Sequence, residues 1–555
     1  MDADQLKQLQ EKNIQKFPKI LEQFNKENAN LFKFDKFHKN ELWITLWKKV
    51  FNILNDERLE EHHILCLNTV RILSRDEASL LKNNIVDDIG CLLKLAHLTM
   101  SSSLVGEPSQ EQESPRSVSS LDVLGDFNMD RVVEALKCLC NLVFQNAEIR
   151  RDCVRQNVAD QIFHRLSSSL QVPEKIELFD MKLLFLITAL ETTVRSRVLF
   201  ELNGLTYMTE LMDEKLRSTQ EFSEGQVDVI IEMLKVMFNI TSCTDKSPSE
   251  NEIQSLHLTS VIRDLLLRFG AMRNERERQV VSHSIDLLTN ISSSCLSELM
   301  LKCDGPSSSS SSSTENCRIF ENRNVTALDI ILNFLLYALD DLETNTASNK
   351  EHVQPVLTIL VKCICSNSTM RHYVRSIVLP PLKDVYKRPE EGNELRNYLC
   401  RLLMNPNMVV RNLSYELLLV CCKKNPSRLI KHFGYGNMAG LFANAGILDC
   451  RKPDTSEYSS DSEDSDTEEY KRIKNSVNPV LGCYMPPTNN PLDGMSDEQK
   501  EYEAEKLAQL VDKLHRGGII KPCRINEEGK PEPVDHILQL QQELPQQQVQ
   551  QKGKD

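Results

Sequence analysis

Apolar residues recur every three to four positions through most of the chain, which is the pattern of amphipathic helices. Clear examples are ELWITLWKKVFNIL at 41–54 and HHILCLNTVRILSR at 62–75, and the pattern resumes at 128 and continues to about 448. Alternating runs of β-branched residues bounded by Asn-Gly or Asp-Gly turns, which are typical of strands, are almost absent. The pattern therefore predicts an all-α protein.

Several of these helical segments resemble one another in sequence. ALKCLCNLVFQN (135–146), MLKVMFNIT (233–241) and IDLLTNIS (285–292) each carry an Asn just before Leu or Ile, at Asn141, Asn239 and Asn290. LLFLITALETTV (183–194) lies midway through the first interval, with Thr188 at the position of the Asn. The resulting spacings of 47 to 51 residues slightly exceed the roughly 40–47 of armadillo and HEAT units. We expect an armadillo/HEAT-like helical solenoid over residues 1–450.

Polar residues on these helices stand four positions apart, as in Arg71 and Arg75 or Asp286 and Asn290. Because four residues make about one helical turn, both members of a pair face the same direction. Stacked in a solenoid, such faces would line one groove, whereas each pair taken alone is compatible with an ordinary solvated face. We expect a partner-binding groove made by Arg71, Arg75, Lys137, Asn141, Thr188, Lys235, Asn239 and Asn290.

Four polar stretches interrupt or follow the helical pattern. Residues 101–120 are rich in Ser, Pro and Glu, and residues 304–316 are mostly Ser, so both are expected to be disordered inserts. Residues 451–495 are first acidic and then rich in Pro and Asn, which predicts a flexible linker. Residues 517–555 end in a Gln-rich stretch and are expected to be a mostly disordered tail.

One more amphipathic helix is predicted at 496–516. Ser496 and Gln499 have the spacing of a capping box, and Gly517 and Gly518 would end the helix. Such a helix must bury its apolar stripe either on the solenoid or against a partner, and the sequence leaves both options open. The stripe consists of Ala504, Leu507, Val511 and Leu514.

The net charge, the length of the apolar runs and the cysteines exclude several classes of function. The net charge of −14 argues against a nucleic-acid partner, because phosphate contacts need a basic face. No apolar run reaches the roughly 18–20 residues that would span a bilayer, and the polar first residues do not resemble a signal peptide. The 17 cysteines are therefore expected to be reduced thiols of a cytoplasmic protein. They lack paired zinc spacing, so we expect neither a metal nor a cofactor.

Motifs for covalent catalysis are missing from the sequence. There is no G-x-S-x-G, no H-E-x-x-H, no kinase catalytic loop, and no G-x-G-x-x-G after a strand. We therefore expect a protein that acts through binding and is not an enzyme.

Seven short segments carry a family resemblance: TVRILSRD (69–76), ALKCLCNLV (135–143), LLFLITAL (183–190), EMLKVMFNIT (232–241), VLPPLKDV (378–385), GYGNMAGL (434–441) and DTEEYK (466–471). In this order they resemble the synembryns, also called resistance-to-inhibitors-of-cholinesterase proteins. These are chaperones and guanine-nucleotide exchange factors for the α subunits (Gα) of heterotrimeric G proteins. The segments span nearly the whole chain, and the two serine-rich inserts depart from the family's usual forms.

The resemblance implies an armadillo/HEAT-like superhelix whose groove, lined by residues that include Arg71, Arg75 and Asn141, takes the C-terminal helix of Gα. It also implies that the helix at 496–516 reaches the nucleotide-binding half of GDP-bound or nucleotide-free Gα. Exchange would then be a population shift, because a protein that prefers nucleotide-free Gα accelerates GDP release without forming a bond. The same preference would let it hold newly made Gα. The family further implies a cytoplasmic monomer that Gα recruits to the cell cortex or plasma membrane.

The acidic segment holds two candidate phosphorylation sites. Ser460 precedes Glu463 by three residues and Ser465 precedes Glu468 by three, which is the context of a casein-kinase-II-type kinase. Both serines match phosphorylated positions of the family. Each phosphate would add roughly −1.5 to −2 charges. We expect these phosphates to dock on the basic cluster of Arg371, Arg375 and Arg411.

Other armadillo-type proteins offer competing interpretations. A nuclear-import adaptor needs a repeated Trp/Asn array, yet the two tryptophans, Trp43 and Trp47, share one helical segment. A scaffold for acidic tails needs a strongly basic groove, and these groove candidates mix Arg and Lys with Asn and Asp. The alternative that stays open is an armadillo-type scaffold that binds peptide tails of other partners.

Overall fold

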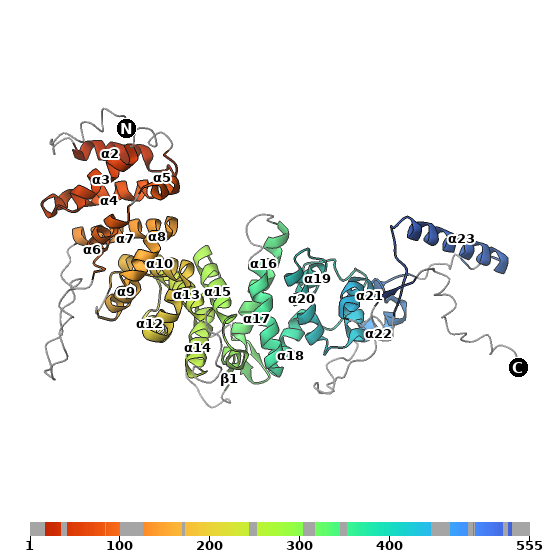
Figure 1. Cartoon of the computed structure of the whole chain (residues 1–555). Coiled ribbons are helices and arrows are strands. Elements are labelled where there is room, and N and C mark those ends of the chain that lie inside the picture. The colour runs from red at the N-terminus through yellow and green to blue at the C-terminus, as the bar shows by residue number, and fades with distance from the viewer. Residues whose placement is uncertain are drawn as a thin grey trace. The chain divides into compact units, whose positions relative to one another are not determined.

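The computed structural model describes residues 17–34, 42–83, 85–99, 126–168, 172–242, 252–303, 317–344, 352–383, 385–445, 467–486, 492, 494–525 and 531–534. The chain divides into two compact units, Met1–Leu299 (unit 1) and Met300–Asp555 (unit 2). Helices dominate the described residues of both units (Figure 1), which confirms the all-α prediction.

Unit 1 is a stack of helices. Its elements are α2 (Phe17–Asn28), α3 (Leu42–Leu54), η3 (Glu57–His62), α4 (His63–Leu73), α5 (Glu77–Lys82), η4 (Val86–Asp88), α6 (Ile89–Leu95), α7 (Asp126–Gln145), α8 (Ala147–Arg155), α9 (Val158–Ser168), α10 (Glu174–Leu190), α11 (Thr192–Ser196), η6 (Arg197–Glu201), α12 (Gly204–Ser218), α13 (Glu224–Thr241), α14 (Glu252–Phe269), α15 (Glu275–Leu288) and η7 (Ser293–Leu299).

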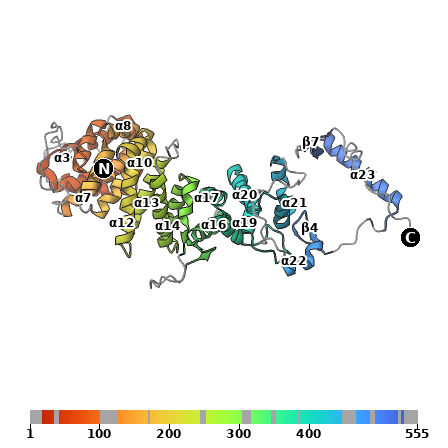
Figure 2. The same cartoon turned by 90° about the horizontal axis from the view of Figure 1, so that it is seen from below.

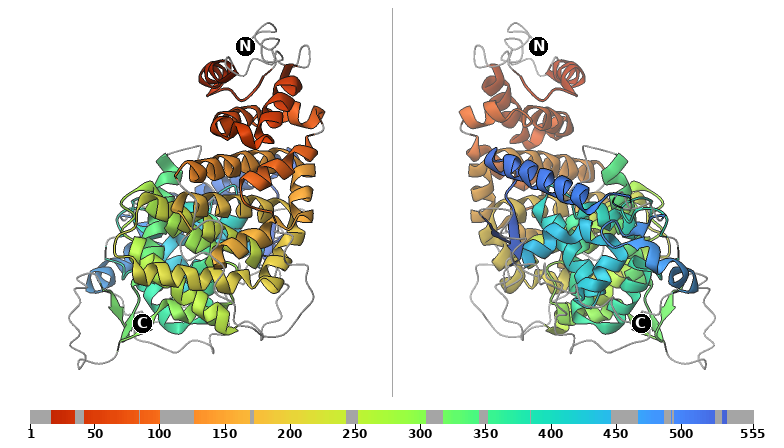
Figure 3. Two further views of the ribbon diagram at one scale, coloured as in Figure 1. Left: turned by 90° about the vertical axis from the view of Figure 1, so that its left-hand side faces the viewer. Right: turned by 90° about the vertical axis from the view of Figure 1, so that its right-hand side faces the viewer.

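Five of these helices form one continuous row. α4 packs against α7, α7 against α10, α10 against α13, and α13 against α15, and we call this set the central row. Figure 2 shows α10 and α13 side by side. A second set covers the row, because α6 packs on α7, α9 on α10, α12 on α13 and α14 on α15. The red-to-yellow helices of Figure 3 lie in these successive layers, which is the stacking of an armadillo-like solenoid.

The same corner recurs where long helices end. α7 and α8 are separated by Asn146 alone, α10 and α11 by Glu191, and in unit 2 Asn367 separates two helices in the same way. Four residues after each separator stands an arginine whose guanidinium donates to the last carbonyls of the preceding helix. A cation is favourable at this helix end because the unpaired carbonyls carry partial negative charge. The bonds are Arg150 to Val143 and Phe144 (2.9 and 3.0 Å), Arg195 to Thr188 and Ala189 (2.6 and 3.0 Å), and Arg371 to Ile364 (3.0 Å).

A buried ion pair crosses the layers of unit 1. Arg165 of α9 and Asp180 of α10 are both buried, with 3.4 Å between Nη1 and Oδ2. Arg165 also donates to the backbone oxygens of Ala96 (2.7 Å) and His97 (3.2 Å), just after α6. Burial raises the pKa of Asp180 to about 7, because the loss of water outweighs the attraction of Arg165. The pair ties α6, α9 and α10 together.

Unit 2 is also mainly helical. Its elements are β1 (Leu301–Lys302), β2 (Ile319–Phe320), β3 (Arg323–Asn324), α16 (Thr326–Thr344), α17 (Val353–Ser366), α18 (Ser368–Val378), α19 (Leu395–Leu402), α20 (Met408–Cys421), α21 (Pro426–Ala445), α22 (Glu468–Ile473), η9 (Lys474–Ser476), β4 (Val477–Asn478), β5 (Cys483–Tyr484), α23 (Asp497–Arg516), β6 (Cys523–Ile525) and β7 (Pro531–Pro533). α17 packs against α16, α18 and α20, and α20 packs against α19 and α21.

The strands were not predicted from the sequence. They form three small antiparallel sheets, ordered β1-β3-β2, β4-β5 and β6-β7, with two or three residues in each strand. Such short strands show no alternation of apolar and polar residues. In the turn between β2 and β3, Glu321 and Asn322 have φ of 47° and 60°. Turns with this conformation are usually recognised in a sequence by a glycine, and this turn has none.

Part of the predicted flexible linker is folded. Within residues 467–486, Tyr470 is buried against Leu382 and Val385, and Thr467 donates to the backbone oxygen of Leu382 (2.5 Å). The structure therefore differs from the sequence-based prediction for these residues. The inserts at 101–120 and 304–316 and the acidic residues 451–466 lie outside the described residues.

Backbone contacts hold this segment on α21. The amides of Tyr435 and Gly436 donate to the oxygens of Pro479 (2.8 Å) and Val480 (2.9 Å). Gly434 has φ of 74°, and a Cβ atom there would lie 2.7 Å from the oxygen of Val480. Pro and Asn in this segment suggested a linker, but the glycine permits a close crossing of two backbones.

Candidate partner-binding surface

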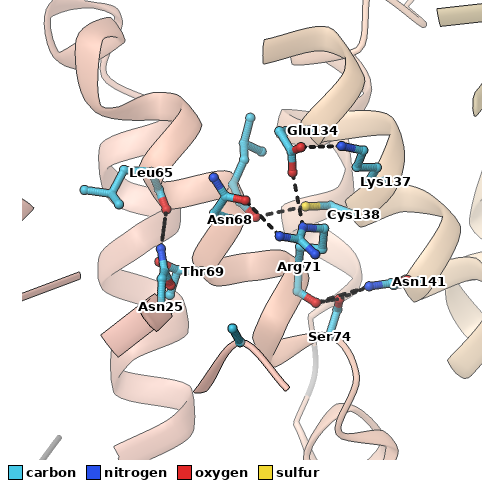
Figure 4. A network of polar contacts seen from close by, with 12 residues as sticks. Asn25, Leu65, Asn68, Thr69, Arg71, Ser74, Glu134, Lys137, Cys138 and Asn141 are labelled. Atoms are coloured by element: carbon cyan, nitrogen blue, oxygen red, sulfur yellow. Dashed lines mark hydrogen bonds and ion pairs between the residues drawn. The ribbon is translucent and has the colours of Figure 1, made fainter. Parts of the chain in front are cut away.

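Charged side chains of α4 and α7 form a network on the central row (Figure 4). Glu134 accepts from Nε of Arg71 at 3.2 Å and from Nζ of Lys137 at 2.5 Å. Arg71 also donates to Oδ1 of Asn68 at 3.0 Å. The side chain of Arg71 is 30% exposed and that of Glu134 15%. Two cations therefore share one shielded carboxylate while keeping part of their surface open.

Arg75 follows α4 and makes contacts of its own. Its Nη1 donates to the backbone oxygen of Ala29 at 2.6 Å, and its guanidinium lies 5.3 Å from the ring centre of Phe32. Burial and the nearby charge of Arg71 lower the pKa of Arg75, which stays positively charged. Arg75 thus joins α4 to the segment after α2.

Two phenylalanines of α10 lie beneath lysines of three helices. Lys137 and Lys182 stand 5.3 and 5.1 Å from the ring centre of Phe179, and Lys235 stands 5.5 Å from that of Phe185. Both rings are half-buried. The central row therefore carries a run of cations over aromatic rings, an arrangement stabilised by the negative face of the ring.

Sequence reasoning missed part of this surface. It named neither the phenylalanines nor Lys182, Glu134 and Glu232, the last of which pairs with Lys235 at 3.0 Å. One signal was available, because the pattern Glu-x-x-Lys-x-x-x-Asn occurs in both α7 and α13. The pairing of lysines with rings on a neighbouring helix had no local signal.

The predicted asparagines make equivalent contacts. Each side-chain amide reaches the end of the preceding helix of the central row, which is α4 for Asn141, α10 for Asn239 and α13 for Asn290. There it meets one backbone oxygen and the hydroxyl three residues further on. The distances are 3.1 and 3.1 Å for Asn141 to Arg71 and Ser74, 3.4 and 3.1 Å for Asn239 to Phe185 and Thr188, and 3.1 and 3.0 Å for Asn290 to Phe238 and Thr241.

The eight predicted groove residues all lie on or directly after central-row helices. Asn239 is 9% exposed, whereas Thr188 of α10 is fully buried. Thr188 therefore supports Asn239 and does not offer a contact to a partner. The other seven keep their place as candidate groove residues, and their partner contacts stay a prediction.

The predicted C-terminal helix is α23. Ser496 and Gln499 form the capping box, with the Gln499 amide donating to Oγ of Ser496 at 3.3 Å. No residue of α23 is buried, and Leu507 is 62% exposed. Of the other stripe residues, Ala504 is exposed and Val511 and Leu514 are half-buried. The described part of the chain thus covers the apolar stripe only in part, at its C-terminal end.

The proposed phosphate-docking arginines lie on two packed helices, α18 and α20. Arg371 donates to the end of α17, Arg375 is buried, and Arg411 is half-buried. Burial of Arg375 limits its access to a phosphate. Ser460 and Ser465 lie outside the described residues, so phosphate docking stays a prediction.

Three further properties of the described residues concern metal binding, membrane crossing and the cysteine thiols. They contain no group of three or more His, Cys, Asp or Glu placed to hold a metal ion. Among the described helices, none combines the length and the apolar character that crossing a membrane requires. Burial raises the pKa of Cys66, Cys363 and Cys421 to about 12, so these thiols are uncharged.

Comparison with known proteins assigns the chain to a family. Residues 66–530 match the family described as "Guanine nucleotide exchange factor synembryn". The chain belongs to the synembryn family. The protein named "Chaperone Ric-8" from Drosophila pseudoobscura pseudoobscura is 52% identical to this synembryn over 569 residues, covering 100% of both chains. "Chaperone Ric-8A" from Gallus gallus is 32% identical, covering 94% of this chain and 93% of its own.

Solved structures similar to this synembryn include a designed armadillo repeat protein. It is 13% identical, with a TM-score of 0.33, and the match covers 53% of this chain and 94% of the designed one.

Proposed function

We propose that this synembryn binds Gα subunits of heterotrimeric G proteins, holds them during folding and accelerates their release of GDP. The observation that carries the proposal is the family match over residues 66–530, together with relatives named as chaperones. The chain would act from the cytoplasm and reach the cell cortex through Gα.

The central row is the proposed binding surface for the C-terminal helix of Gα. The C-terminal end of a helix carries partial negative charge, and the terminal carboxylate adds a full charge. Lys137, Lys182 and Lys235 supply cations beside aromatic rings on this row, with Arg71 at its N-terminal end. This complementarity supports the placement.

Nucleotide exchange would follow from preferential binding. If the chain binds nucleotide-free Gα more tightly than GDP-bound Gα, it must weaken GDP binding by the same factor. No bond is made or broken, and the partly exposed stripe of α23 offers a second contact toward the nucleotide-binding half of Gα. The same preference would stabilise newly synthesised Gα before it acquires nucleotide.

Release of labelled GDP from a panel of Gα subunits, with and without the chain, tests the proposal. We expect a saturable acceleration and a stable complex that an excess of GTP dissociates. Unchanged release from every Gα, together with no complex by gel filtration, would contradict it.

Deletion of residues 496–555 separates the two proposed contacts. We expect it to weaken exchange more than it weakens binding of a peptide with the sequence of the Gα C-terminal helix. Equal losses in both assays would instead give α23 a purely structural role.

A further inference from the structure

The three asparagines of the central row are held in one orientation by their neighbours. The side-chain nitrogen of an asparagine carries two protons. In each case both protons are used, one on a backbone oxygen and one on a hydroxyl oxygen. The hydroxyls belong to Ser74, Thr188 and Thr241, which lie 67, 51 and 49 residues before their asparagines.

The hydroxyls have a fixed direction as well. Each donates its only proton within its own helix: Ser74 to the oxygen of Arg71 (2.9 Å), Thr188 to that of Leu184 (2.8 Å) and Thr241 to that of Met237 (2.7 Å). Because the proton is spent, each hydroxyl can only accept from the asparagine. We call each set of carbonyl, hydroxyl and amide a staple.

A staple also determines where the asparagine oxygen lies. Turning the amide over would place Oδ1 against the lone pairs of a carbonyl and a hydroxyl, which is unfavourable. Within the described chain no residue donates a hydrogen bond to Oδ1 of Asn141, Asn239 or Asn290, and none of these oxygens is among the buried unpartnered atoms. Asn141 and Asn290 are half-buried and Asn239 is 9% exposed, so each oxygen is left as an acceptor that the described chain does not use.

We propose that Ser74, Thr188 and Thr241 are positioning residues that make the asparagines of the central row hydrogen-bond acceptors only. The proposal rests on the proposed function, because it concerns how the row receives a partner helix. Backbone N–H groups inside a helix are already bonded, so the partner must donate from side chains. The row would thus select a helix that presents amide, ammonium or guanidinium groups toward Asn141, Asn239 and Asn290.

Substitution of Thr188 tests the proposal without touching the partner, since Thr188 is fully buried. Thr188→Val keeps the shape and removes the hydroxyl, whereas Thr188→Ser keeps the hydroxyl and is the matched control. We expect Thr188→Val to weaken binding of a fluorescein-labelled Gα C-terminal peptide by about fivefold to tenfold, and Thr188→Ser to stay near wild type. The double variant of Thr188→Val with Asn239→Ala should bind no more weakly than Asn239→Ala alone.

A second measurement reports on the staple itself. In protein labelled with ¹⁵N-asparagine, the side-chain protons of Asn239 should exchange slowly in wild type and Thr188→Ser and rapidly in Thr188→Val. Thr241→Val, with Asn290 as the reporter, repeats the test at another staple if Thr188→Val does not fold.

The outcomes distinguish failure of the positioning role from failure of the proposed function. Wild-type affinity in a folded Thr188→Val or Thr241→Val variant overturns the positioning role, as does unchanged proton exchange. A wild-type chain that binds no Gα peptide overturns the proposed function and the partner chemistry inferred here, whatever the exchange rates are.

Discussion

Each of the two units is stabilised by a different kind of internal contact. In unit 1 the central row is joined by side chains that recur from repeat to repeat, such as the amides of Asn141, Asn239 and Asn290. In unit 2 the segment 467–486 is joined to α21 by backbone hydrogen bonds at Tyr435 and Gly436. Repeated side-chain contacts distribute stability over many sites, whereas a backbone crossing concentrates it where glycine is required.

The largest effect is expected at the buried pair of unit 1. Arg165→Ala leaves Asp180 uncompensated and frees the oxygens of Ala96 and His97. We expect a loss of about 3–5 kcal/mol in the free energy of unfolding of unit 1. Urea unfolding followed by tryptophan fluorescence measures it, because both tryptophans lie in α3 and Trp47 donates to Asp88 beside α6.

The deficit of Arg165→Ala should depend on pH. The folded-state pKa of Asp180, about 7, lies above its value in an unfolded chain, so this group contributes less stability as pH rises toward 7. At pH 6 the carboxyl is mostly protonated with or without Arg165, whereas at pH 8 its charge needs the arginine. The variant should therefore fall further below wild type at pH 8 than at pH 6. A deficit that is equal at both pH values would contradict the charge-based explanation.

The next effect is expected at the backbone crossing of unit 2. Gly434→Ala forces an L-residue into positive φ and places Cβ against Val480, which should cost about 1–3 kcal/mol. Limited proteolysis should then cut within 467–486, while tryptophan fluorescence of unit 1 stays unchanged. Gly440→Ala is the matched control, because a Cβ atom there meets nothing within 4 Å.

A smaller effect is expected at a repeated corner. Arg195→Ala removes two hydrogen bonds to the end of α10 and one to Ser242, at 3.2 Å. We expect a loss of about 1–2 kcal/mol in unit 1, because Arg195 is half-buried and water can replace part of its hydrogen bonding. Arg195→Lys keeps the charge at the helix end and should recover part of the loss in the same urea titration. Full recovery would show that charge alone is sufficient.

The smallest effect on stability is expected on the surface of the central row. Lys182 is half-buried and lies over Phe179, so Lys182→Ala should change the melting temperature little. We expect it to weaken binding of the Gα peptide by about threefold to fivefold, more so at low salt. Lys19 is exposed on α2, a helix outside the central row, and Lys19→Ala is the control with unchanged affinity.

The two units also differ in how much of their structure the sequence could predict. Helical periodicity and the recurring asparagines predicted stacked helices, and Asn141, Asn239 and Asn290 are indeed equivalent in their contacts. Their use on a neighbouring helix could not be predicted, because each hydroxyl partner stands about 50 residues or more away. For the same reason Thr188 was taken for a groove residue.

The fold of unit 2 was harder to predict at its C-terminal end. Pro and Asn in 467–486 suggested a linker, since composition reports local preferences only. The crossing at Gly434 depends on a segment more than 40 residues further along the chain. Similarly, the lysine–phenylalanine pairs of the central row join α7 and α13 to α10, and no local pattern marks such pairs.

Three corners between helices, where Arg150, Arg195 and Arg371 donate to the end of the preceding helix, limit where residues can be inserted into the chain. Between α7 and α8, α10 and α11, and α17 and α18 a single residue separates the helices, and an insertion there would displace the arginine from its carbonyls. The serine-rich residues 101–120 belong instead to the connection that precedes α7. An engineered insertion or tag should therefore destabilise the chain more at any of these three corners than in the connection before α7.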